Sequence, residues 1–280
     1  PEHPAVIFMH GGPGYNSVVF EQSTAHALAS EDIFVISYDR RGEGRNDKLT
    51  ASYTFEQTFE DILEIYSRYN LNKATLVGHS FGGLVATKFA EKFPEKTHAL
   101  ILVGAPVEFQ ETLRTIISSS KKIYNENDDA TNLDYIKMLE EMDTSSYAYA
   151  SYSFMHAMGN GFYSTNTPNQ KAKEISAQLA SDSLVQQFAA KMEYKAPQKF
   201  WENERYTTIN LTENLQNLIS QKVPIYGIYG MDDGLFSTEQ IHKLRLLIGT
   251  ENVYFLKNSS HSVFVDRQEK FIELVSNWSD

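Results

Sequence analysis

The stretch Ala74–Gly83 constrains the fold more than any other part of the chain. Ala74–Val77 is apolar and predicts a buried strand, and the spacing of apolar residues predicts a helix over Phe81–Phe93. Between them, the residues GHSFG at 78–82 fit the G-x-S-x-G nucleophile elbow, a tight turn that lifts a serine hydroxyl above the edge of a sheet. The glycines leave room where strand and helix approach closely. We therefore predict that Ser80 is a nucleophile at a helix N-terminus, where free N–H groups favour a developing negative charge.

Strand and helix patterns alternate along the rest of the chain. Continuous apolar runs predict strands buried on both faces, at 5–9, 33–38, 74–77, 99–104, 223–230 and 252–256. Helical patterns lie between them, at about 20–30, 54–69, 81–93, 238–248 and 266–277, and the second of these opens on a predicted capping box at Thr54–Gln57. This order predicts an α/β fold with a mostly parallel sheet flanked by helices. Catalytic groups in such sheets lie beyond the carboxyl ends of the strands.

Two further loops are predicted at this edge of the sheet. His10–Gly14 follows the first strand and holds three glycines and a proline, so that its backbone N–H groups can point inward as donors. Asp39–Arg45 follows the second strand and is charged and rich in glycine. We favour a bracing role for this second loop, in which Asp and Arg side chains pair and hold the neighbouring loop, over a catalytic one.

The sequence changes character from about residue 107 to 220. Apolar residues recur there at helical spacing, polar linkers separate the helices, and no strong buried strand is predicted. We interpret 107–220 as a helical cap over the carboxyl edge of the sheet, inserted between a first core segment, 1–106, and a second, 221–280. Aromatic and methionine residues gather at 147–163 of the cap. We assign most of them, and His156, to packing between helices, and a few to the lining of an apolar pocket.

The amino-acid composition argues against several kinds of partner and cofactor. The net charge is −11, with 25 basic and 36 acidic residues, which argues against nucleic acid as a partner. There is no cysteine, so disulfides and thiolate catalysis are excluded, and no His/Asp cluster has the spacing of metal ligands, so neither a metal nor another cofactor is predicted. No apolar run reaches the roughly 18 residues of a membrane span.

The start of the chain does not decide in which cellular compartment the protein works. No signal peptide is visible, which slightly favours the cytoplasm. The chain nevertheless begins abruptly on Pro1 and enters a strand within a few residues, so we expect the natural N-terminus to be missing, and export stays possible. The oligomeric state is also open.

Three candidate catalytic residues follow one another in the order Ser80, Asp233, His261. The acid follows a late strand, and the histidine follows the last strand. A serine hydroxyl needs a base to take its proton, and the pKa of a histidine suits that task near neutral pH. A carboxylate must then hold the histidine tautomer. Asp232 and Asp233 compete for this position, and we favour Asp233. The N–H of Phe81, directly after the nucleophile, and that of Gly12 are the expected oxyanion donors.

These motifs resemble those of α/β-hydrolase-fold serine hydrolases over nearly the whole chain. The strings HGGPG at 10–14, DRRGEGR at 39–45 and GHSFGG at 78–83 together resemble the proline iminopeptidase group, which removes an N-terminal residue, typically proline, from short peptides. The resemblance implies Ser80, Asp233 and His261 as the triad, and a helical cap. The first two strands of that group are missing ahead of Ala5.

Two departures bear on the substrate. Proline iminopeptidases usually have a tryptophan after the nucleophile, whereas GHSFGG, with Phe81, is common among esterases, lactonases and C–C bond hydrolases. The family binds the substrate amino group with cap glutamates, one of them in an ENHYF-like string, and Trp201–Tyr206 is similar but not the same. Glu202 or Glu204 is therefore the candidate anchor for a free amino group.

Three functions remain open on the sequence. The first, which the resemblance favours, is an aminopeptidase that releases N-terminal proline or another residue from short peptides through an acyl-serine intermediate. The second is a carboxylesterase, lactonase or C–C bond hydrolase acting on a small apolar substrate. The third is a binding protein or receptor that kept the fold, although a pure binder would need neither triad nor oxyanion donors. A serine at the elbow also argues against epoxide hydrolases and haloalkane dehalogenases, which use an aspartate there.

Overall fold

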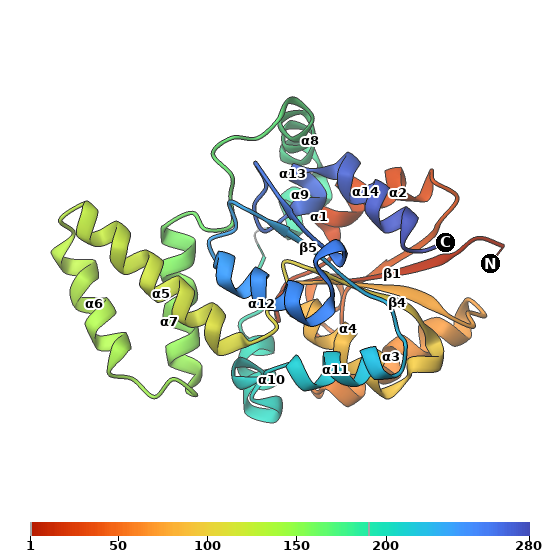
Figure 1. Ribbon diagram of the computed structural model, residues 1–280, viewed down its shortest axis with the longest axis horizontal. Coiled ribbons are helices and arrows are strands. Elements are labelled where there is room, and N and C mark those ends of the chain that lie inside the picture. The colour runs from red at the N-terminus through yellow and green to blue at the C-terminus, as the bar shows by residue number, and fades with distance from the viewer. Residues whose placement is uncertain (1, 190) are drawn as a thin grey trace.

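The computed structural model describes residues 2–189 and 191–280. Its centre is a parallel sheet with the strand order β2-β1-β3-β4-β5-β6 (Figure 1). The strands are β1 Ala5–Met9, β2 Phe34–Tyr38, β3 Ala74–His79, β4 Thr97–Val103, β5 Ile225–Gly230 and β6 Val253–Leu256. The predicted α/β class and the predicted strands are thus confirmed, and β1, where the order reverses, lies next to the elbow strand β3.

Helices cover both faces of the sheet (Figure 1). Strands buried on both faces supply side chains to two apolar layers, so that Ile7 of β1 packs into one layer and Phe8 into the other. The first layer is covered by α3 Phe55–Arg68, α4 Phe81–Lys92 and α12 Thr238–Ile248, and the second by α1 Val18–Phe20, α2 His26–Ala29, α13 Val263–Asp266 and α14 Gln268–Asn277. The alternation of side chains along each strand therefore explains why every strand is apolar throughout.

Two helices differ in detail from the prediction. The helix predicted at 20–30 is interrupted by a π-helical turn at Glu21–Ala25. Thr54 caps α3 by accepting from the N–H of Gln57, but the Gln57 side chain accepts from the N–H of Ser52 instead of closing the predicted capping box. A complete capping box is present at the start of α12, between Ser237 and Gln240.

Between β4 and β5 the described residues form helices and connecting loops, with one isolated β-bridge and no strand. These helices are α5 Phe109–Glu126, α6 Ala130–Glu140, α7 Tyr147–Gly159, α8 Gln170–Ser181, α9 Ser183–Phe188, α10 Lys195–Glu204 and α11 Thr212–Ser220. In Figure 1, α5, α6 and α7 project from the body as an arm, whereas α8 and α9 lie beside α1 and α13. None of the helices in residues 2–189 and 191–280 is long and apolar enough to cross a bilayer.

The two connections between cap and core run side by side. Glu108 and Asn210 form an isolated antiparallel bridge, and the N–H of Leu211 donates to Val107 O at 2.7 Å. Helix α11 follows this bridge and packs Leu215 and Leu218 into the layer that α4 covers. This packing favours a cap that returns to the core near residue 211 rather than 220.

Candidate active site

Ser80 occupies the turn between β3 and α4 in a conformation that L-amino acids rarely adopt, with φ 54° and ψ −123°. The neighbouring glycines make this turn possible. A Cβ on Gly78 would lie 2.6 Å from Gly82 O, and one on Gly82 would collide with Met9 O. Strand, turn and helix are thus packed as tightly as an elbow requires, and the serine is lifted beyond the end of β3.

His261 and Asp233 meet at the same edge, on the loops that follow β6 and β5. His261 Nδ1 donates to Asp233 Oδ2 at 2.7 Å, and both side chains are buried. The other carboxylate oxygen accepts from the N–H of Leu235 at 3.0 Å, so both oxygens are held. Because Nδ1 carries the proton, the lone pair of Nε2 is available to accept one.

The structure distinguishes the two adjacent aspartates. Asp233 is 3% exposed and bonded to His261, whereas Asp232 is exposed and accepts a hydrogen bond from Thr165 Oγ1. The geometry therefore favours Asp233, as the sequence analysis does, because Asp232 has a different partner.

Ser80 and His261 both border the end of β4. The N–H of Ser80 donates to Val103 O at 2.9 Å, and a Cβ on the next residue, Gly104, would lie 3.2 Å from His261 Nδ1. No hydrogen bond joins Ser80 Oγ to His261 in residues 2–189 and 191–280. In enzymes without a bound substrate this contact is often long, and it tightens when the substrate binds.

His79, directly before the nucleophile, is a site residue that the sequence analysis did not single out. Its Nε2 donates to His261 O at 3.0 Å, and the two rings lie 4.8 Å apart. Burial lowers the pKa of His79 to about 3, and the nearby His261 contributes to the decrease, so His79 is neutral at physiological pH. The position of His79 within the GHSFG motif could have pointed to a role in the site. The motif alone could not show that its partner is the backbone carbonyl of His261.

The loop His10–Gly14 packs against Ser80. A Cβ on Gly11 would lie 3.1 Å from Ser80 Cβ. Among the residues that the structure describes, the backbone N–H groups of Gly12 and Phe81 donate no hydrogen bond. Both predicted donors are therefore unengaged beside Ser80.

Arg40 holds this loop in place. Its guanidinium donates to His10 O and Gly11 O, both at 2.6 Å, and pairs with Glu43 at 2.9 Å. Glu43 in turn accepts from the N–H of Gly14 at 2.7 Å. Arg40 is 3% exposed and Glu43 is fully buried, so a buried ion pair clamps both ends of the donor loop.

Asp39 holds the segment around Ser17, which follows the donor loop, in place. Burial alone would raise the pKa of its carboxyl, but hydrogen bonds from Arg45 and Ser17 outweigh this effect and hold the pKa well below its usual range. The ionised carboxylate thus ties the segment after the donor loop to the end of β2. The predicted bracing role of Asp39–Arg45 agrees with these contacts.

The adjacent residues Arg40 and Arg41 allow a matched test of this clamp. Arg40→Met should lower the free energy of unfolding by about 3–5 kcal/mol, because it leaves the buried Glu43 carboxylate without a positive charge to offset its own. Arg41→Met should cost at most about 1 kcal/mol, because Arg41 and its partner Asp61 are both accessible to solvent. Urea unfolding of both variants measures the difference. Equal losses would show that Arg40 does not clamp the loop.

Glu202 and Glu204 form their hydrogen bonds and ion pairs with residues other than Ser80, Asp233 and His261. Glu202 is exposed and pairs with Lys199 at 2.5 Å, and Glu204 Oε1 accepts from the N–H of Phe55 at 2.8 Å, at the start of α3. Within the described residues, no hydrogen bond joins either carboxylate to Ser80 or His261. The prediction that one of them anchors a substrate amino group therefore gains no support from the structure.

Aromatic residues instead surround the histidine. The ring of Tyr163, from the cap, lies 5.2 Å from that of His261 and perpendicular to it, and the ring of Phe236 lies 6.4 Å away and nearly parallel. Sequence spacing gave no signal for Tyr163, because it is 98 residues from His261 along the chain. The cap thus adds apolar surface, rather than a carboxylate, beside His261.

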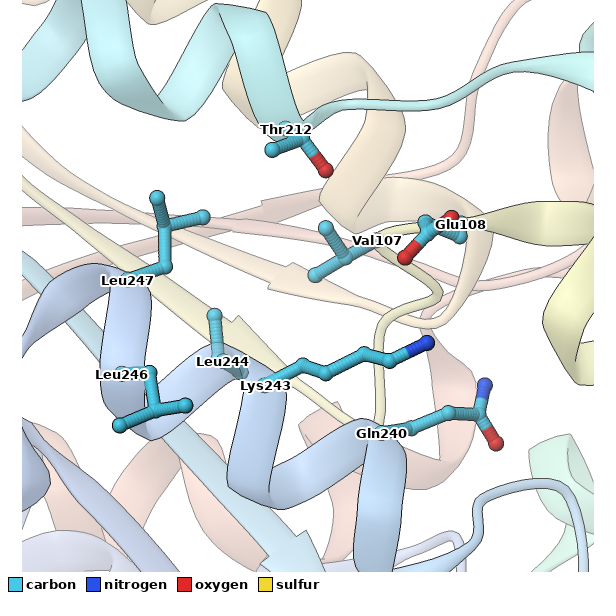
Figure 2. A pocket seen from close by; sticks show the side chains of 8 residues that line it. All are labelled: Val107, Glu108, Thr212, Gln240, Lys243, Leu244, Leu246 and Leu247. Atoms are coloured by element: carbon cyan, nitrogen blue, oxygen red, sulfur yellow. The ribbon is translucent and has the colours of Figure 1, made fainter.

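Two cavities within the described residues are lined by residues other than Ser80. Figure 2 shows one of about 380 Å³, where Val107, Glu108 and Thr212 of the cap connections meet Lys243 and the leucines of α12. The other, of about 770 Å³, lies in the arm and includes His156. The described residues include no group of three His, Asp or Glu side chains that could hold a metal ion.

Comparison with known proteins agrees with this geometry. Residues 4–268 match the family model described as alpha/beta hydrolase fold. The chain is 23% identical to the proline iminopeptidase PfmaB of Pestalotiopsis fici, over 97% of this chain and 90% of that protein. Among solved structures, it is similar to a proline iminopeptidase-related protein from Thermus thermophilus, with a TM-score of 0.67, 18% identity and coverage of 99% of this chain and 89% of that one.

An esterase from Exiguobacterium antarcticum, EaEST, has the same fold, with a TM-score of 0.62, 20% identity and coverage of 99% of this chain and 91% of that one. At these identities the solved structures show a common fold and no common substrate. The family model, in contrast, covers almost the entire chain, and it agrees with the parallel sheet and the elbow described above. The chain belongs to the alpha/beta hydrolase fold family.

Proposed function

We propose that the chain is a serine hydrolase that works through an acyl-enzyme at Ser80. The observation that carries the proposal is the buried His261–Asp233 pair beside a serine held at φ 54°. A serine in so strained a turn, with unengaged N–H groups on both sides, has a geometry that serves nucleophilic attack better than it serves stability.

Each group has a defined task in this mechanism. His261 Nε2 takes the proton of Ser80 Oγ as the oxygen attacks the substrate carbonyl carbon. The N–H groups of Gly12 and Phe81 donate to the oxyanion that forms. His261 then gives its proton to the leaving group as the bond between carbonyl carbon and leaving group breaks. Water repeats the sequence and releases the acid, while Asp233 stabilises the imidazolium throughout.

For the substrate, we favour a carboxylic ester or lactone with an apolar acyl group. The aminopeptidase reaction calls for an acidic anchor, and the two candidate glutamates have other partners, Lys199 and the N–H of Phe55. The rings of Tyr163 and Phe236 beside His261 suit an apolar acyl chain. The second candidate, release of an N-terminal residue from a short peptide, is supported by the similarity to PfmaB over nearly the full chain.

A substrate panel separates these candidates. Butyryl and octanoyl p-nitrophenyl esters and a γ-lactone would be compared with prolyl-naphthylamide and its N-acetyl form, with Ser80→Ala as the control. We expect hydrolysis of the esters and lactone, and little cleavage of either amide. Cleavage of prolyl-naphthylamide but not of its N-acetyl form would instead establish an aminopeptidase. Glu204→Gln would then be compared with Glu202→Gln to find the anchor.

The proposal also makes Ser80 chemically reactive. A fluorophosphonate should label the wild-type chain at Ser80 and leave Ser80→Ala unlabelled, as mass spectrometry of the tryptic peptides would show. Absence both of labelling and of turnover on the whole panel would favour a binding protein that kept the fold.

A further inference from the structure

The arm formed by α5, α6 and α7 holds the larger cavity, of about 770 Å³. Its volume is within the range of about 300–1,000 Å³ that is usual for small-molecule sites. Figure 1 shows the arm projecting away from the sheet that carries Ser80. None of Ser80, Asp233 and His261 lines this cavity, so the proposed hydrolytic reaction does not account for it.

The walls of the cavity are apolar and partly open to solvent. They include Tyr135, Met138, Leu139, Met142, Tyr152 and Met155. Four of these side chains are at least half exposed, namely Tyr135 at 54%, Met138 at 62%, Tyr152 at 50% and Met155 at 59%. The sequence analysis assigned most of the aromatic and methionine residues of α7 to helix packing, which does not explain Tyr152 and Met155, because they face the cavity. Methionine side chains adapt to irregular apolar ligands.

Three residues that line the cavity, Tyr124, His156 and Asn160, belong to one hydrogen-bond network. Asn160 Nδ2 donates to Tyr124 OH at 2.9 Å and to Ser120 Oγ at 3.1 Å. Tyr124 OH lies 2.8 Å from His156 Nδ1, and no other acceptor of the described residues is bonded to this hydroxyl, so we assign the hydroxyl as the donor of this bond. His156 therefore carries its proton on Nε2, which makes no hydrogen bond within the described residues. The network thus leaves one N–H donor unengaged on a residue that lines the cavity.

The charges around the cavity select against an anion. Asp129 lines it, and hydrogen bonds from the side chain and the N–H of Asn132 hold the pKa of the Asp129 carboxyl below its usual value. Asp129 is therefore ionised at neutral pH, and no lysine or arginine of the described residues lines the cavity to offset it. Burial lowers the pKa of His156, so the imidazole is neutral as well.

We propose that the arm cavity binds a small, uncharged apolar molecule that carries a hydrogen-bond acceptor, such as the carbonyl of an amide, ester or ketone. The apolar part contacts Met138, Met142 and Met155, and the carbonyl accepts from His156 Nε2–H. This site is separate from Ser80 and does not depend on the proposed hydrolysis.

Methionine methyl resonances test the site directly. The full chain with ¹³C-methyl methionine would be titrated with 4-phenylbutanamide, 4-phenylbutanoate and 4-phenylbutylamine, which share one apolar body and differ in charge. We expect the amide to bind tightest and to shift Met138, Met142 and Met155, while Met9 and Met231 stay unchanged. Tighter binding of the carboxylate or the amine, or shifts at all methionines alike, would overturn the proposal.

Two histidine variants test the hydrogen bond. His156→Phe keeps a ring of similar size and removes the donor, so it should weaken amide binding about tenfold, the effect of one hydrogen bond of about 1.4 kcal/mol. His242→Phe, on the exposed side of α12, should change nothing. If His156→Phe unfolds, as its melting temperature would show, Met138→Glu replaces it, because a charge at that exposed wall should abolish amide binding.

A second copy of the chain is the alternative occupant of the cavity, and light scattering tests for it. If two chains associate through this surface, the measured mass would rise with protein concentration, and Met138→Glu would return it to the mass of one chain. A stable dimer through this surface would overturn the small-molecule proposal. A constant mass with saturable amide shifts would support it.

Discussion

Ser80→Ala is expected to lower kcat by roughly 10⁶-fold on the best substrate, because removal of a nucleophilic serine has about that effect in enzymes with this triad. The remaining activity would come from the oxyanion donors and from substrate binding, which do not need the hydroxyl. Initial rates on the fastest ester of the panel, in an assay that detects about 10⁻⁷ of the wild-type rate, measure the loss.

The controls separate chemistry from folding. Ser80→Ala keeps the strained backbone and should unfold at the same urea concentration as wild type. Ser80→Gly should be more stable by about 1 kcal/mol, because glycine adopts a φ of 54° without strain. Activity of Ser80→Ala above roughly one-thousandth of wild type would contradict the assignment of Ser80 as the nucleophile, given the residual catalysis expected without it.

Asp233→Asn should lower kcat by roughly 10⁴-fold, the loss seen when the triad acid becomes an amide. The hydrogen bond of 2.7 Å from His261 Nδ1 to Asp233 Oδ2 explains the size of the effect. An asparagine that places its NH₂ group toward His261 would donate to Nδ1 and put the proton on Nε2, where it cannot accept one from Ser80. The rate would be measured from about pH 6 to 10 to exclude a simple shift of the optimum.

Asp232→Asn is the matched control, one residue away. Its carboxylate is exposed and bonded to Thr165, so the substitution should change kcat less than about threefold, as is usual for surface positions. The reverse ranking would place the acid at Asp232. Equal and small losses for both variants would mean that His261 works without a carboxylate.

The core could be predicted from the sequence because its strands are buried on both faces. Such strands appear as continuous apolar runs, and the strand Ala5–Met9 has the predicted bounds, as has the helix Thr238–Ile248. The elbow was predictable for a related reason, since only glycine fits at Gly78 and Gly82. The π-helical turn at Glu21–Ala25 has no comparable residue pattern, and it went unpredicted.

Side-chain partners were the part that the sequence did not determine. Asp233 and Asp232 have the same chemistry, and only the fold buries one of them against His261. The string that contains Glu204 resembles a substrate anchor, yet its carboxylate caps a helix that starts 149 residues earlier. A short motif specifies residue types, whereas a contact between distant segments depends on the packing of everything between them.

The side-by-side cap connections have a consequence for how this family can vary. Because Val107 and Leu211 are joined by a backbone hydrogen bond, the whole of the intervening chain leaves and re-enters the core at nearly one point. An insertion with adjacent ends can be lengthened, shortened or exchanged without moving the strands on either side. Ser80, Asp233 and His261 all lie outside it. The cap can thus change through recombination while these three residues, and Phe236 beside His261, are kept.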